Sequence, residues 1–257
     1  MSAAIGIEDL GKVFVRDGEG IEVLAHVDLQ IVRGSFVALV GRSGCGKSTL
    51  LNAIAGLIPP SSGRITFDGA AALYPRSDVG YMTQKETLLP WRSVLHNVAM
   101  PLELVGVGAA ERETRARELL NVVGLLHAER RYPRELSGGM QRRASLARML
   151  ARDPHILLLD EPFGALDAQL RGDLQAELLR LWQDTQKTVV FVTHDIDEAL
   201  VLADRVVVLR EGGRVALDAA LDFPRPRDLR AVRSEATFGA MHDRLREAIG
   251  TATMSVA

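Results

Sequence analysis

The 257-residue sequence has one cysteine, no long apolar run and almost no excess of charge of either sign. Because Cys45 stands alone, no intramolecular disulfide can form, which agrees with a reducing compartment. No run approaches the ~20 apolar residues of a membrane span, so a role at a membrane would act through a partner. The net charge of −2 gives no indication of a basic surface for nucleic acid. Residues 1–10 lack a basic segment, so we expect no secretory signal.

Glycines gather in residues 41–49, between an apolar run at 36–40 and a helical pattern at 50–55. The spacing G-x-x-x-x-G-K-[S/T] between a strand and a helix predicts a phosphate-binding loop. Its glycines let successive N–H groups face one concavity, and the helix N-terminus adds unpaired N–H groups. Lys47 brings a positive charge to the β- and γ-phosphates, and Ser48 offers a hydroxyl to Mg²⁺. A glycine-rich turn without a ligand is the alternative, which the flanking strand and helix disfavour. The expected nucleotide contacts are Gly41, Arg42, Ser43, Gly44, Cys45, Gly46, Lys47, Ser48 and Thr49.

A second strong pattern is the apolar run 156–159, which ends at Asp160 and Glu161. It predicts a parallel strand covered on both faces, whose carboxyl end brings both acids to the ligand-binding edge of an α/β sheet. Adjacent strand residues face opposite ways, so we expect different roles. Asp160 suits contact with Mg²⁺, and Glu161 suits polarising a water molecule. Two acids in an ordinary turn are the alternative.

The segment Ser137-Gly138-Gly139 precedes a helical pattern at 142–151. Ser137 is a plausible N-cap, and the glycines leave backbone N–H groups open to an anion. By itself, this pattern is usually only a helix start.

Three further residues are compatible with two interpretations each. Gln84, after the strand predicted at 78–82, either reaches a metal through its amide or is a solvated loop residue. His194, after the strand predicted at 188–193, is either structural or a γ-phosphate contact. Phe14 either stacks on an adenine ring or is a partly buried strand residue.

The remaining patterns complete an alternation of strands and helices. Further short strands are expected at 5–14, 21–32, 64–67, 205–209 and 214–217, and further helices at 93–101, 111–123, 168–185, 195–203 and 229–249. The charges at Glu111, Arg112, Glu113, Arg115, Arg117 and Glu118 are most simply a solvated helix face. Residues 251–257 are expected to fray.

Together these motifs, in this order, resemble the ATP-binding cassette (ABC) ATPases over nearly the whole chain. The resemblance implies an α/β fold: a P-loop (RecA-like) core with an antiparallel β subdomain, an α-helical subdomain and a C-terminal helical tail. The implied ATPase domain is 1–221, with its core at 1–90 and 153–221 and its helical subdomain at 91–152. Residues 222–257 would form the C-terminal linker and helix.

The same resemblance implies roles, with ATP and Mg²⁺ as cofactors. Lys47 and the loop amides would bind the phosphates, and Ser48, Gln84 and Asp160 would serve Mg²⁺. Glu161 would be the catalytic base and His194 the γ-phosphate switch. Phe14 matches the position of an aromatic residue stacked on adenine. The segment Ser137-Gly138-Gly139 would complete the ATP site of a second subunit, with Asp167 at the same joint.

A closer resemblance is to the ATPase subunits of nitrate, sulfonate, taurine and related importers, carried by residues 88–94, 160–167, 191–199 and 223–227. It implies a homodimer at the cytoplasmic face of the inner membrane, docked peripherally on permease subunits, served indirectly by a solute-binding protein and binding no nucleic acid. The region after Gln84, through Trp91 and Leu95, would receive a permease helix.

Two departures from the family pattern are Glu211-Gly212-Gly213, in place of a Pro-Gly turn, and Met140-Gln141-Arg142-Arg143, where Gln-Gln-Arg is commoner. Neither involves a residue expected to do chemistry. The alternative function is a non-transport ABC ATPase acting mechanically on nucleic acid or the ribosome. Against it stand the short spacing between Gln84 and Ser137, which leaves no room for a long coiled coil, and the presence of only one cassette.

Overall fold

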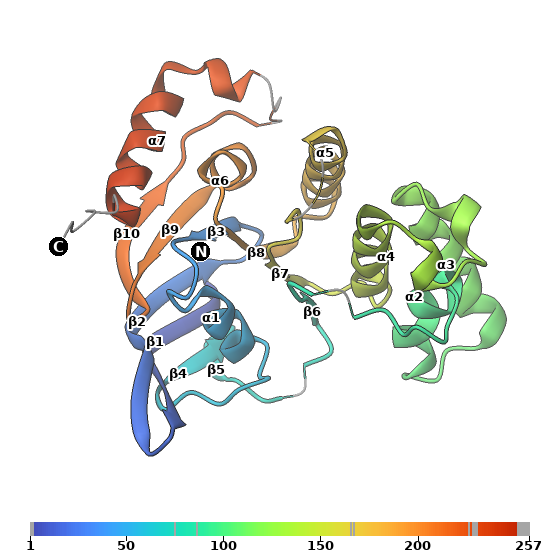
Figure 1. The fold of residues 1–257 in the computed structure, drawn as a ribbon, viewed down its shortest axis with the longest axis horizontal. Coiled ribbons are helices and arrows are strands. Elements are labelled where there is room, and N and C mark those ends of the chain that lie inside the picture. The colour runs from blue at the N-terminus through green and yellow to red at the C-terminus, as the bar shows by residue number, and fades with distance from the viewer. Residues whose placement is uncertain are drawn as a thin grey trace. The chain divides into compact units, whose positions relative to one another are not determined.

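A computed structural model describes residues 3–74, 76–85, 87–164, 166, 168–225, 227 and 231–250. The chain forms two compact units: unit 1 contains residues 1–76 and 188–257, and unit 2 contains residues 77–187 (Figure 1). No helix in the described part of the chain has the length and apolar character needed to cross a membrane. The expected mixture of parallel strands, antiparallel strands and helices is present.

Unit 1 contains a set of parallel strands whose ends carry two of the motifs. Strand β3 (Phe36–Val40) lies between β8 (Thr188–Thr193) and β9 (Arg205–Arg210) and is parallel to both. Strand β10 (Arg214–Ala220) pairs antiparallel with β9. Every residue of β3 and β8 is buried, as expected for apolar strands covered on both faces. Since Val40 pairs with Thr193, the phosphate loop and His194 leave the sheet at the same edge.

An antiparallel sheet with the order β2-β1-β4-β5 completes the strands of unit 1. The strands are β1 (Ala3–Arg16), β2 (Glu19–Val32), β4 (Ser62–Phe67) and β5 (Ala70–Ala71). The expectation of short first strands was wrong, because β1 and β2 have 14 residues each. The predicted turn at Asp17-Gly18 has positive φ at both residues, and register shifts between the two strands accommodate the twist of a long hairpin.

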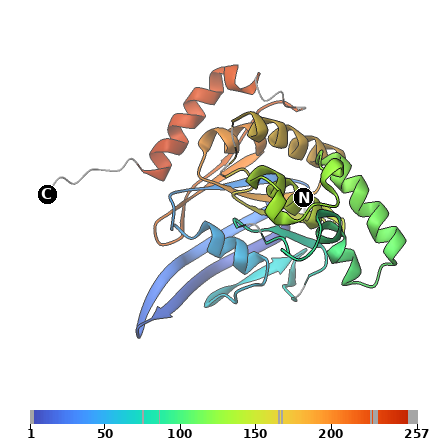
Figure 2. The same ribbon diagram turned by 45° about the vertical axis from the view of Figure 1, so that its right-hand side comes forward.

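Three α-helices accompany these sheets: α1 (Lys47–Ile54), α6 (Ile196–Leu202) and α7 (Ala236–Ile249). Asp195 caps α6, because its side chain accepts hydrogen bonds from the N–H groups of Asp197 and Glu198. Figures 1 and 2 both show α7 along the outside of unit 1, where it packs against α6, β9 and β10. The helix expected over 229–249 begins only at Ala236, after a 3₁₀ turn at Val232–Ser234. Residues 228–230 and 251–257 lie outside the described residues.

Unit 2 contains the parallel pair β6 (Val79–Met82) and β7 (Ile156–Asp160), in which Met82 pairs with Leu159. The segments that carry Gln84 and Glu161 therefore leave these strands at one edge. The long helix α5 (Ala168–Thr185) follows within the same unit, with the bounds that its pattern predicts.

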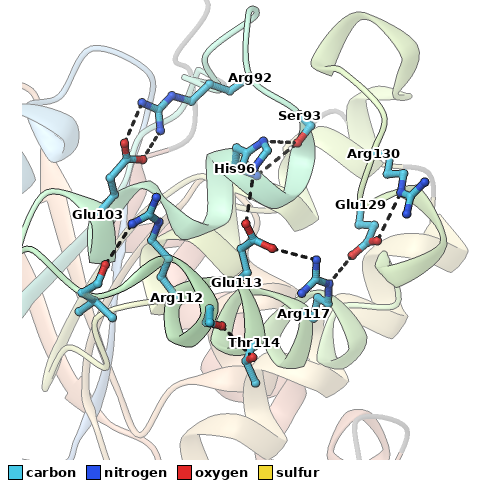
Figure 3. Close-up of polar contacts among 12 residues, drawn as sticks. Arg92, Ser93, His96, Glu103, Arg112, Glu113, Thr114, Arg117, Glu129 and Arg130 are labelled. Atoms are coloured by element: carbon cyan, nitrogen blue, oxygen red, sulfur yellow. Dashed lines mark hydrogen bonds and ion pairs between the residues drawn. The ribbon is translucent and has the colours of Figure 1, made fainter.

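Helices α2 (Val94–Glu103), α3 (Ala109–Val122) and α4 (Gly138–Leu150) also belong to unit 2. On the surface, α2 and α3 are joined by His96 and Glu113, whose Nε2 and Oε1 atoms lie 4.0 Å apart, as Figure 3 shows. The Arg92 guanidinium donates to Glu103, and this hydrogen bond lowers the pKa of the Glu103 carboxyl. Arg117 donates to Glu113 of its own helix and to Glu129 beyond it. Of the charges expected as a solvated face, Glu111 and Glu118 are exposed and the other four are half-buried, and some pair within α3 itself, as Arg115 does with Glu118 at 3.1 Å.

Candidate nucleotide-binding site

The phosphate loop needs glycine at Gly46 for two reasons. This residue is the N-cap of α1 with φ of 101°, a left-handed conformation that favours glycine. A Cβ at Gly46 would also lie 2.7 Å from the Val23 oxygen and 2.9 Å from Leu24 Cδ2. Because glycine has no capping side chain, it leaves the first N–H groups of α1 to an outside acceptor. The loop thus suits an anion such as a nucleotide phosphate.

Lys47 holds its positive charge at this loop. Its side chain is buried, and Nζ donates to the backbone oxygens of Gly41 at 2.7 Å and Arg42 at 2.8 Å. The buried thiol of Cys45 lies 3.8 Å from the same Nζ atom. The ammonium is therefore next to the loop amides, where a charge for phosphate is needed, and Cys45 packs beneath the loop.

The strand beside β3 presents His194, which is exposed at the same sheet edge. The residues around it are fixed by a buried pair, because Thr193 Oγ1 donates to Glu198 Oε2 at 2.6 Å. The same hydroxyl accepts the backbone N–H of Asp195 at 3.0 Å. Sequence reasoning missed this pair. A hydroxyl at the last strand position and a glutamate five residues later were the available signal.

The C-terminal helix also reaches the phosphate loop, which the sequence did not indicate. Arg42 in the loop donates to the Gly250 oxygen, and Arg210 donates to the Ala248 oxygen at 2.6 Å. Both acceptors lie at the C-terminal end of α7, where helix carbonyls lack partners of their own.

Phe14 lies in β1 with 41% of its surface exposed, and Lys12 Nζ is 5.0 Å from its ring centroid. It is a strand residue, but an exposed one and not partly buried, and its stacking on adenine stays a prediction. Its exposed face nevertheless leaves room for a flat ring to stack.

In unit 2, the strand ends bring Gln84 and Glu161 into contact: Gln84 Nε2 donates to Glu161 Oε2 at 3.1 Å. The two neighbouring acids differ in environment as expected, since Asp160 is buried and Glu161 is partly exposed. Burial, and secondarily the charge of Asp160, raises the pKa of Tyr81. Glu161 has φ of 46°, an uncommon conformation for a residue other than glycine.

Helix α4 begins as the sequence predicts, with Ser137 as its N-cap. Ser137 Oγ accepts the N–H of Met140 at 3.3 Å. Ser137 and Gly138 are exposed, whereas Gly139 is buried. A Cβ added to Gly138 would meet nothing within 4 Å, so packing within the described chain does not require glycine there. Asp167, expected near the same joint, lies outside the described residues.

The donors expected for Mg²⁺ are the Ser48 hydroxyl in unit 1 and the Gln84 amide and Asp160 carboxylate in unit 2. Oxygen donors of this kind, with phosphate oxygens and water, fit Mg²⁺. Among the described residues, no cluster of three or more His, Cys, Asp or Glu is placed to hold a metal by itself. The meeting of the donors around one ion stays a prediction.

Unit 2 also contains a cavity of about 190 Å³ beyond Gln84. Its lining includes Tyr81, Lys85, Thr87, Met100, Arg148 and Met149. Within the region expected to receive a permease helix, Trp91 is 71% exposed and can contact a partner. Leu95 is buried, so it can support that surface from beneath but does not form part of it.

Comparisons with known proteins agree with these features. The family model described as ABC transporter matches residues 24–164. A taurine import ATP-binding protein of Rhizobium johnstonii is 47% identical over 93% of this chain and 94% of its own. A nitrate import ATP-binding protein of Synechococcus elongatus is also 47% identical, over 88% of this chain and 35% of its own. A dimeric ATP-binding cassette solved with ADP and Pi in a post-hydrolysis state superimposes with a TM-score of 0.79 at 33% identity, over 86% of this chain and 100% of its own. The chain therefore belongs to the ABC transporter family, and within it to the ATP-binding ATPases.

Proposed function

We propose that this ATPase energises the uptake of a small anionic solute through a membrane permease. The proposal rests on the phosphate loop. Gly46 has a left-handed backbone conformation at the start of α1, and the buried Lys47 donates a hydrogen bond to a backbone oxygen of the loop. Two relatives, one named for taurine import and one for nitrate import, support this class of solute. Taurine carries a sulfonate and nitrate is an anion, so a small oxyanion is their shared chemistry.

The proposed roles follow from the local chemistry. Lys47 and the loop amides hold the phosphates, His194 contacts the γ-phosphate and Phe14 stacks on adenine. Glu161 orients and deprotonates the attacking water, a contribution of about 10²–10⁴-fold in rate. Ser48, Gln84 and Asp160 would hold Mg²⁺, which would supply neutralisation of phosphate charge when bound.

The second half of each ATP site is proposed to come from another copy of the chain. The exposed Ser137 and Gly138 at the start of α4 offer helix N–H groups to an anion outside their own chain, and Asp167 is assigned to the same joint. The solved relatives that are dimers support this arrangement. The permease is proposed to bind at the cavity lined by Lys85 and Thr87 and at the exposed Trp91.

The protein would thus lie peripherally at the cytoplasmic face of the inner membrane, served indirectly by a solute-binding protein. We also propose that the chain divides into a core at 1–90 and 153–221, a helical subdomain at 91–152 and a tail at 222–257.

The test compares three forms of the purified chain. Wild type should hydrolyse ATP, and Glu161→Gln should bind ATP, lose at least about 10²-fold in kcat and accumulate as a dimer with ATP. Lys47→Ala should lose nucleotide affinity because it removes the loop's charge. Fast turnover by Glu161→Gln would remove Glu161 from its role, and normal binding by Lys47→Ala would contradict the phosphate-loop assignment.

The solute class is tested with membranes that contain the permease subunits that co-purify with the chain. ATP-dependent uptake of nitrate or taurine, abolished by Glu161→Gln, would support the proposal. Purification with ribosomes or nucleic acid in place of a membrane protein would overturn it.

A further inference from the structure

Arg142 of helix α4 is buried with 3% of its surface exposed. Its guanidinium contacts both strand ends of unit 2. Nη1 donates to the backbone oxygens of Thr83 at 3.0 Å and Gln84 at 2.6 Å. Nη2 donates to the oxygens of Asp160, at 3.0 Å, and Glu161. Nε donates to the oxygen of Pro162 at 2.9 Å. A guanidinium has five N–H groups in a fixed plane, so this carbonyl cluster matches its full donor set.

These contacts meet at the two residues whose side chains touch. Gln84 donates to the Glu161 carboxylate, and the backbone oxygens of both residues accept from Arg142. Beyond the β6–β7 pairing, one guanidinium therefore ties together the two main chains from which that side-chain hydrogen bond is made. The Glu161 oxygen also accepts the N–H of Gly164 at 3.1 Å, so its peptide is held from two sides.

The backbone at Glu161 needs such support. Its φ of 46° is left-handed, and a residue with a side chain keeps that conformation only where its surroundings impose it. The direction of the Glu161 carboxylate depends on that conformation. A small rotation there would move the carboxylate away from an attacking water.

The sequence alone assigned Arg142 no such role. Where Gln-Gln-Arg is commoner, this chain has Gln141-Arg142-Arg143. A glutamine amide has two N–H donors and no charge, so it could serve at most two of the five carbonyls that Arg142 contacts here. Arg142, at which this chain departs from the family pattern, thus contacts the peptides of the proposed Mg²⁺ ligands and of the proposed catalytic base.

We propose that Arg142 is a positioning residue for ATP hydrolysis, which ties the peptides of Gln84 and Glu161 to helix α4. The inference rests on the proposed function, because it assigns Arg142 an effect through Glu161. It predicts a loss in the rate of the chemical step with ATP binding retained, since the phosphate loop belongs to the other unit.

The experiment measures kcat and KM for ATP in Arg142→Met, Arg142→Lys and the control Arg143→Gln. Arg143 is the next residue of α4 and donates to the Val123 oxygen at 3.2 Å, away from the strand ends. We expect Arg142→Met to lower kcat by about 10²-fold with little change in KM, a loss that misplacing a catalytic group by ~1 Å can cause. Arg142→Lys keeps a charge and three donors, so it should recover part of kcat. Arg143→Gln should stay near wild type.

A double-mutant cycle separates positioning from general damage. If Arg142 acts through Glu161, adding Arg142→Met to Glu161→Gln should cost little further turnover. An equal loss in both backgrounds, or a kcat of Arg142→Met within twofold of wild type, would overturn the inference. Should Arg142→Met fail to fold by circular dichroism, the same cycle with Arg142→Lys decides. Absence of hydrolysis by wild type would instead overturn the proposed function.

Discussion

Thr193 donates its hydroxyl to the Glu198 carboxylate at 2.6 Å, and both residues are buried. The pair links the end of β8 to α6 and lies on either side of His194 in the chain. The same hydrogen bond therefore stabilises unit 1 and holds the backbone that determines the direction in which His194 leaves the sheet.

We therefore predict that Thr193→Val lowers both stability and activity. Valine keeps the shape but removes the hydroxyl, and a lost hydrogen bond to a charged group costs about 1.5–3 kcal/mol. Thr193→Ser keeps the hydroxyl and should recover most of the loss. Urea unfolding and kcat provide the measurements, and a valine variant as stable as wild type would contradict the assignment.

Two of the three positive-φ glycines of the phosphate loop, Gly44 and Gly46, should respond differently to alanine. At Gly46 a Cβ meets the Val23 oxygen at 2.7 Å, whereas at Gly44 it meets nothing within 4 Å. Both carry the strain of positive φ, about 1–2 kcal/mol, but only Gly46→Ala must also displace the backbone. We expect Gly46→Ala to lose ATP binding and Gly44→Ala to retain most of it, as measured by titration with a fluorescent nucleotide. Equal losses would indicate that φ alone sets the requirement.

The ion pair of Asp153 and Lys187 should make stability depend on pH. The hydrogen bond from the buried Lys187, at 2.7 Å, holds the pKa of Asp153 below its ordinary value of 3.8. A lowered carboxyl pKa stabilises the fold above the ordinary value, and this contribution is lost as the pH falls through the lowered one. Asp153→Asn should thus be less stable at pH 7 and equal to wild type at strongly acidic pH. The difference should stay below about 1 kcal/mol, because Asp153 is largely exposed.

Asp17→Asn provides a matched control for that experiment. Asp17 also has positive φ, at 53°, and its Arg16 partner is exposed. Asparagine tolerates this backbone at both positions. Asp17→Asn should change stability little, because both partners of its ion pair are exposed, and an equal effect in the two variants would show that the backbone, and not Lys187, is responsible.

Alkylation of Cys45 should block nucleotide binding. The thiol is buried 3.8 Å from Lys47 Nζ, so an added group would push the ammonium and the loop apart. Reaction should be slow without denaturant, because the sulfur must first become exposed, and it should be slower still with ATP present. Unchanged ATP affinity after complete modification, verified by mass spectrometry, would contradict this prediction.

The sequence by itself determined the features whose causes are local. Residues 41–49 predict a phosphate-binding loop, because glycines and a lysine stand between a strand and a helix. The apolar run that ends at Asp160 predicts a buried strand, and Ser137 predicts the start of a helix. Each follows from backbone preference and hydrophobic pattern within a few residues. Strand length was misjudged in β1 and β2 because pairing across the hairpin, and not local composition, extends them.

Only the tertiary structure decided which distant groups meet. Arg142 lies about 60 residues from Thr83 in the chain, and Arg42 lies 208 residues from Gly250. In the sequence, an arginine in a helix pattern looks the same whether it faces water or a cluster of carbonyls. The difference arises from how elements remote in sequence pack, because buried backbone oxygens need donors and packing determines which side chain supplies them.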